Sequence, residues 1–132
     1  MKEFENDFMK FWFEEGILIS KFQKDTILDL EAVKKTIEMR EQISVEKDQY
    51  WLYDITNMKS VTTEARQHAA QHGHNLIYAC AGLVDSYMTK FIFTTYKKFS
   101  KPDFPFAFFT SKEKAVQWLS EIKAKNEEVS SF

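Results

Sequence analysis

Residues 75–84 read NLIYACAGLV, and every side chain after the asparagine is apolar or small. A strand with one face in water alternates apolar and polar side chains, whereas an unbroken apolar run is typical of a strand covered on both faces. Strands of that kind occur mainly in parallel sheets with helices on either side. This run restricts the fold more than any other segment, and it indicates a layered α/β protein.

Segments with strand and helix patterns alternate along the chain. The expected strands are 8–14, 17–23, 49–56, 75–84 and 104–110, and the expected helices are 29–44, 62–73, 85–101 and 111–128. Glu15-Gly16 separates the first two strands, and a glycine at this place suits a tight antiparallel hairpin. Asp29, Thr62 or Thr63, and Ser111 are the expected N-caps of three of the helices.

This order predicts a three-layer α/β fold. We expect a mostly parallel central sheet of about five strands, an antiparallel N-terminal hairpin and about four helices. A length of 132 residues suits one domain, and no repeat or linker divides the chain. We therefore expect a single domain over residues 1–132, with residues 126–132 as a frayed tail.

Charge, hydropathy and cysteine content exclude several classes of partner. The formal net charge is −2 and no basic stripe is present, so we expect no contact with nucleic acid. No apolar run approaches the roughly 20 residues of a membrane helix, so we expect no membrane insertion. Cys80 is the one cysteine of the sequence, which excludes an internal disulfide and favours a cytoplasmic protein with an inert, buried thiol.

The three histidines of the chain all lie in the segment EARQHAAQHGHNL, residues 64–76. His68 and His72 share one side of a predicted helix and His74 follows closely, a spacing that a zinc or nickel site could use. The alternative is that the cluster marks a helix end, because Gly73 stands where a C′ residue belongs and histidine complements the terminal carbonyls. We favour the helix end and expect no metal and no cofactor.

Known catalytic motifs are absent from the sequence. It has no nucleophile elbow, no Walker A motif and no dinucleotide-binding glycine motif, so we expect that the protein is not an enzyme. Asp54 is a separate case, because it ends a predicted parallel strand at the edge where open α/β sheets bind their ligands. Its alternative role is to hydrogen-bond the loop that follows.

The segment from Asp54 to Arg66, DITNMKSVTTEAR, resembles the signature of the STAS family, the sulfate transporter and anti-sigma factor antagonist domains. In that family a strand ends in Asp-Leu-Ser or similar, and the next helix opens with Asp-Ser-Ser-Gly, whose first serine a partner kinase phosphorylates. The letters DIT match the strand end, and Thr62 and Thr63 fall at the positions of the aspartate and the phosphorylated serine. The order of elements also matches over nearly the whole chain, so the resemblance implies a SpoIIAA-like fold.

The resemblance implies a regulatory module that acts through contact with a protein partner. The expected docking surface consists of Asp54, Lys59, Thr62, Thr63 and Arg66, with phosphorylation of Thr62 or Thr63 as its switch. A phosphate there would gain from the helix dipole and would change the charge of the surface. The alternative is that the threonines only cap the helix.

The expected helix over residues 85–101 carries an apolar stripe. The stripe consists of Met88, Phe91, Ile92, Thr95 and Phe99, which we expect to face inward. Tyr87 and Tyr96 flank this stripe, and Phe93 lies well off it. We expect Tyr87, Phe93 and Tyr96 to be oligomer contacts, most simply in a homodimer.

Two classes of function remain. The first is a non-enzymatic, STAS-like regulatory or protein-interaction module. The alternative is a carrier of a small apolar or lipid-like ligand, which the phenylalanine-rich helix and the segment FPFAFF indicate. The small residues Ala79, Ala81 and Gly82 permit either close helix packing or a buried apolar ligand.

Overall fold

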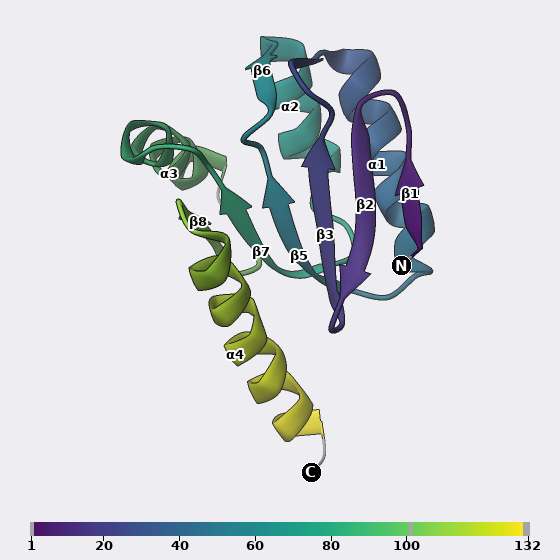
Figure 1. Cartoon of the computed structure of the whole chain (residues 1–132), viewed down its shortest axis with the longest axis vertical. Coiled ribbons are helices and arrows are strands. Elements are labelled where there is room, and N and C mark those ends of the chain that lie inside the picture. The colour runs from purple at the N-terminus through teal and green to yellow at the C-terminus, as the bar shows by residue number, and fades with distance from the viewer. Residues whose placement is uncertain (1, 101, 131–132) are drawn as a thin grey trace.

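A computed structural model describes residues 2–100 and 102–130, except for the side chains of residues 92, 95–100 and 129–130 (Figure 1). Within these residues, six strands form the main sheet in the order β1-β2-β3-β5-β7-β8. Their bounds are β1 (Glu3–Glu5), β2 (Met9–Glu14), β3 (Ile17–Phe22), β5 (Gln49–Asp54), β7 (Ile77–Leu83) and β8 (Phe106–Phe109). Strands β1, β2 and β3 are antiparallel neighbours, and the later pairs are all parallel.

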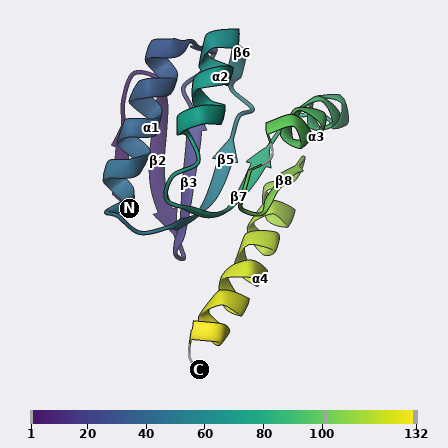
Figure 2. The same ribbon diagram turned by 180° about the vertical axis from the view of Figure 1, so that it is seen from behind.

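Helices cover both faces of this sheet. Helices α1 (Leu30–Ser44) and α2 (Thr63–His72) lie on one face, and α4 (Lys112–Ser130) packs on β5, β7 and β8 from the other face (Figures 1 and 2). Helix α3 (Tyr87–Ser100) stands at the edge of the sheet, where it contacts β8. The predicted fold class is confirmed, with a mostly parallel sheet, an N-terminal hairpin and four helices in the described part of the chain.

The predicted hairpin and helix starts are present. Glu15 and Gly16 both have positive φ, 50° and 81°, which is the conformation of a tight two-residue turn between twisted strands. Asp29 accepts a hydrogen bond from the Ala32 amide (2.9 Å) at the start of α1. The Ser111 hydroxyl accepts one from the Lys114 amide (3.4 Å) at the start of α4. The hairpin turn and the two helix starts depend on residues within three positions of one another, so the sequence shows them directly.

Three short strands were not predicted, and one of them is β1 at the edge of the main sheet. Strand β4 (Thr26–Leu28) pairs in parallel with β6 (Met58–Val61), apart from the main sheet. The pair ties the segment before α1 to the segment before α2, and the Thr62 amide donates to the Leu28 carbonyl (3.0 Å). Both helices therefore start from one fixed point at the same end of the molecule.

The two faces of the sheet have different cores. On the α4 side, Ala79 and Ala81 of β7 cluster with Ala115 and Leu119 of α4, all of them fully buried. Small side chains on the strand permit this close approach of the helix, as predicted for Ala79 and Ala81. On the α1 and α2 side the cluster is larger and rich in aromatic rings.

Helix α4 runs further than expected. It ends at Ser130, so residues 126–130 are helical although a frayed tail was predicted there. The Asn126 side chain donates a hydrogen bond to the Tyr50 hydroxyl (3.0 Å). This contact joins the last part of the helix to the sheet.

Candidate ligand-binding site

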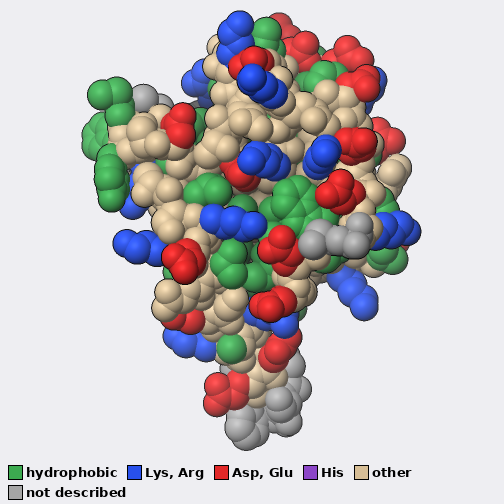
Figure 3. All heavy atoms as spheres, viewed as in Figure 1, with side chains coloured by type: hydrophobic (Ala, Val, Ile, Leu, Met, Phe, Trp, Pro, Cys, Tyr) green, Lys and Arg blue, Asp and Glu red, His purple; other side chains and the backbone are tan. Residues whose placement is uncertain are grey.

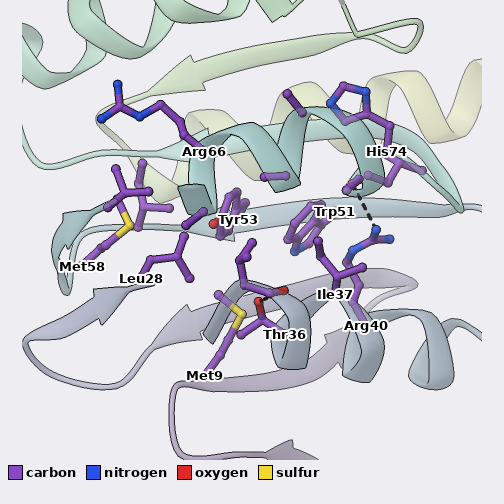
Figure 4. A pocket seen from close by; sticks show the side chains of 18 of the residues that line it. Met9, Leu28, Thr36, Ile37, Arg40, Trp51, Tyr53, Met58, Arg66 and His74 are labelled. Atoms are coloured by element: carbon purple, nitrogen blue, oxygen red, sulfur yellow. Dashed lines mark hydrogen bonds between the residues drawn. The ribbon is translucent and has the colours of Figure 1, made fainter. Parts of the chain in front are cut away.

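A cavity of about 510 Å³ lies between the sheet and helices α1 and α2, and it extends to α3 and β8 (Figure 4). Ligand pockets in proteins have volumes of roughly 300–1,000 Å³. Most of its lining is aromatic or aliphatic; two arginines, a histidine, a tyrosine and a threonine provide its polar side chains. Protein interiors normally leave few voids larger than a water molecule, so an apolar space of this size is the main candidate site.

Aromatic side chains from β5 and β8 form the floor of the cavity. Trp51 and Tyr53 are two residues apart on β5 and stack with ring centroids 4.5 Å apart. Phe106 and Phe108 of β8 lie beside each other at 4.9 Å. The period of two along a strand places each pair on one face. The floor is therefore a row of rings directed toward the helices.

Gly82 makes this floor possible. It lies between Tyr53 and Phe108 in the sheet register. A Cβ atom at this position would be 2.4 Å from Cδ1 of Phe108, closer than real contacts allow. The Phe108 ring therefore lies across the backbone of β7 because residue 82 has no side chain.

Small residues on α2 leave the space open above the floor. Ala65, Ala69 and Ala70 line the cavity from this helix. A helix normally fills the gap to a sheet with leucine or isoleucine side chains, whereas alanine leaves a gap unless the helix moves closer. The shared anchor of β4 and β6 holds the start of α2, so the alanines leave volume unfilled.

Arg40 is a buried cation in the wall of the cavity. Its side chain is 1% exposed, and its Nη1 and Nη2 groups donate to the carbonyls of Asn75 (2.8 Å) and Gly73 (3.2 Å). The guanidinium also lies over the Trp51 ring, 4.8 Å from its centroid. Burial lowers its pKa. In the described part of the chain Arg40 has no carboxylate partner, so its charge is held by carbonyl dipoles and an aromatic ring.

These carbonyls lie just beyond the end of α2, where the conformation differs from the prediction. Gly73 was expected to take the left-handed conformation of a C′ residue, but its φ is −92°. The residue with a left-handed φ is Leu76, at 60°. A Cβ atom on Gly73 would approach the Ala69 carbonyl oxygen to 2.6 Å, so glycine serves close packing here.

Tyr53 presents a hydroxyl to the cavity. Its side chain points toward the end where Leu28 and Met58 lie (Figure 4). No hydrogen bond joins this hydroxyl to any residue that the structure describes. The Thr36 hydroxyl, in contrast, donates to the Val33 carbonyl (3.0 Å). Burial raises the pKa of Tyr53, so the group keeps its proton and can donate it.

The three histidines are divided between two environments. The rings of His68 and His72 lie 4.6 Å apart on α2. His74 lines the cavity instead and meets the Phe104 ring edge-on at 5.4 Å. Burial lowers the pKa of His74. Among the described residues, no three metal-binding side chains come together.

The predicted docking residues are spread over different environments. Asp54 is buried and accepts hydrogen bonds from the amide and hydroxyl of Thr56 (2.9 and 2.6 Å), which is the loop role considered as its alternative. Thr62 caps α2, because its hydroxyl accepts from the Ala65 amide (3.1 Å). Thr63 and Lys59 are exposed. Arg66 is exposed as well, but it also lines the rim of the cavity.

Helix α3 turns a different face toward the sheet from the one that the sequence predicted. Phe93, expected on the outer side, lies 5.5 Å from Phe108 and lines the cavity. Met88 and Phe91, expected inward, are 75% and 72% exposed. Its main contact with the sheet is with β8. The side chains of Ile92, Thr95 and Phe99, the rest of the expected stripe, lie outside the described residues. Figure 3 shows apolar side chains gathered at this helix.

The remaining predicted contacts concern the outer side of α3. Tyr87 is 77% exposed, so its side chain is accessible to a partner. The side chain of Tyr96 lies outside the described residues. Phe93 is turned inward, whereas the oligomer contact expected from sequence stays a prediction for Tyr87 and Tyr96.

Cys80 is fully buried under the cavity floor. Burial raises the pKa of its thiol, so the sulfur stays protonated and unreactive. This is the inert core thiol that the sequence indicated.

The sheet order, the helix layers and the position of the cavity define an α/β protein with a SpoIIAA-like fold. A similar structure is the crystal structure of an uncharacterised protein of the DUF3478 family, with a SpoIIAA-like fold, from Shewanella loihica PV-4. The TM-score is 0.66 with 17% sequence identity, over 84% of this chain and 91% of that chain. At this identity the likeness shows the fold alone.

The family follows from the sequence. The model of a family described as a domain of unknown function (DUF7793) matches residues 11–123, and the chain belongs to this family. No curated protein matches the chain. The resemblance to STAS domains therefore holds for the fold, and the family that is shown is DUF7793. Among the described residues, no helix has the length and apolar character needed to cross a membrane.

Proposed function

We propose that this STAS-like module is not an enzyme and that it binds a small apolar or lipid-like ligand in the cavity beneath α2. The observation that carries the proposal is the cavity itself, about 510 Å³ of apolar space with a floor of four aromatic rings. An empty space of this size forfeits the dispersion contacts that its walls would otherwise make. A ligand that fills it supplies those contacts and stabilises the folded chain.

Native mass spectrometry of the protein, purified gently from its own host, tests this proposal. We expect the native mass to exceed the chain mass by that of a small molecule, which denaturation releases. Extraction with an organic solvent should then recover the same compound. A bare chain in the native spectrum, together with an empty extract, would contradict the proposal.

A second function is favoured by one observation at the start of α2. We infer that Thr63 is the phosphorylation site of a docking surface, because its side chain is exposed while the Thr62 hydroxyl is engaged in the cap. A phosphate on Thr63 would lie in the first turn of the helix that lines the cavity, where free amides and the helix dipole stabilise it. Lys59 is exposed nearby in sequence and adds a positive charge to this surface.

Intact mass and peptide mapping of protein from its own host test the switch. We expect a phosphate in a fraction of the wild-type chains, lost in Thr63→Ala. Thr62→Ala is the matched control and should keep the modification, although it loses the cap. Absence of the phosphate across growth conditions, or its persistence in Thr63→Ala, would rule out Thr63 as the switch.

A further inference from the structure

The cavity combines apolar walls with a buried positive charge. Arg40 and Arg66 line it, and no aspartate or glutamate does so in the described part of the chain. Arg40 is fully buried and has no carboxylate partner among the described residues. Because Arg40 is desolvated, its charge acts more strongly on the adjoining part of the cavity than an exposed cation would.

The Tyr53 hydroxyl adds a directional donor to this field. Tyr53 is half-buried near the end of β5 and lines the cavity, and its side chain points toward the end where Leu28 and Met58 lie (Figure 4). Its hydroxyl has no hydrogen-bond partner among the described residues, so it is available to a ligand in the cavity. With its proton retained, the phenol is suited to donate to an anionic oxygen.

We infer that the ligand is an amphiphile with one carboxylate, such as a medium-chain fatty acid, whose carboxylate accepts a hydrogen bond from Tyr53 while its chain lies on the aromatic floor. This inference rests on the proposed ligand-binding function and names its ligand class. A carboxylate fits better than a phosphate, because the described lining offers one free hydroxyl donor and a phosphate dianion needs several. The Phe106 and Phe108 rings and the alanines of α2 provide the surface for the apolar chain.

Tyr53 and the arginines have separate roles in this arrangement. Tyr53 supplies the direct hydrogen bond to the carboxylate. Arg40 lies over the Trp51 ring and contributes a positive electrostatic potential. It also donates hydrogen bonds to the carbonyls that follow α2. Arg66 is exposed at the rim, where a cation favours the approach of an anion. Removal of the Tyr53 hydroxyl therefore tests the site without disturbing a buried charge.

Isothermal titration calorimetry with decanoate and decan-1-ol at pH 7.4 tests the inference. The two probes have the same apolar chain, and only decanoate carries a charge. We expect the wild-type protein to bind decanoate about tenfold more tightly than decan-1-ol. This factor corresponds to the smallest free energy expected for a hydrogen bond to a charged group. Tyr53→Phe should lose about tenfold in decanoate affinity and only a few-fold in decanol affinity.

Tyr78→Phe is the matched control. Tyr78 is 48% exposed and stacks on Tyr50 at the opposite face of the sheet, so this variant should bind both probes as the wild type does. Unfolding in urea checks that both variants are folded.

Equal binding of the two probes by the wild type would overturn the inference of a carboxylate ligand while leaving the proposed function intact. If Tyr53→Phe kept the preference for decanoate over decan-1-ol, Tyr53 would not be the residue that binds the carboxylate. If the wild type bound neither probe, the proposed function would be contradicted as well.

Discussion

Arg40 links the folding of the chain to its site. It occupies a helical position in the apolar stripe of α1, where a leucine would normally pack. Its guanidinium reaches two carbonyls beyond the end of α2 and covers the Trp51 ring. The residue therefore joins α1 to the segment that follows α2, beside the cavity. A buried cation without a carboxylate is unusual, because burial penalises the charge unless dipoles replace water.

Arg40→Met tests this role at the scale of one residue. The variant keeps most of the apolar volume but loses two charge-assisted hydrogen bonds, each worth about 1.5–3 kcal/mol. We expect a loss of about 2–3 kcal/mol in the free energy of unfolding, since methionine recovers part of the cost by apolar burial. Urea unfolding measures it, with the exposed Lys34→Met on the same helix as the control. Equal stability of the two variants would show that Arg40 does not hold α2.

At the scale of elements, the sequence indicates those parts of the fold that depend on local chemistry. The hairpin follows from Glu15-Gly16, and Asp29 and Ser111 begin their helices as expected because a cap bonds within three residues. Strands β4 and β6 were missed because each has at most four residues and pairs with a segment about thirty residues away. Their pairing is a tertiary contact without a local pattern.

The orientation of α3 and the cavity also depend on tertiary contacts. Apolar residues lie on several sides of α3, so its position at β8 decides that Phe93 is half-buried against Phe108 and Phe91 is exposed. One feature of the sequence indicates the cavity, namely that Arg40 lies at helical spacing from the apolar residues Val33 and Ile37 of α1. Its volume could not be predicted, because the alanines of α2 would equally suit a helix lying closer to the sheet. The start of α2 beside β4 and β6 decides between these outcomes.

For the molecule as a whole, the two layers of helices have different roles. Helix α4 packs closely on Ala79 and Ala81 and gives one dense core. On the other face α3 stands apart at the sheet edge, while α1 and α2 keep to the side of β2, β3 and β5 (Figure 2). The space between these helices is only partly filled by aromatic rings. The fold thus combines a closely packed side with a side that contains the cavity.

The measurement that tests this account most directly is a fluorescence titration with N-phenyl-1-naphthylamine, a neutral apolar probe that brightens when it leaves water. Ala69→Trp fills the cavity from α2, whereas Ala124→Trp places the same side chain on the exposed side of α4. The account predicts saturable binding by the wild type and by Ala124→Trp, and at least a tenfold loss of affinity in Ala69→Trp, since a filled cavity excludes the probe. Equal binding by Ala69→Trp and Ala124→Trp would contradict the assignment of the cavity as the binding site.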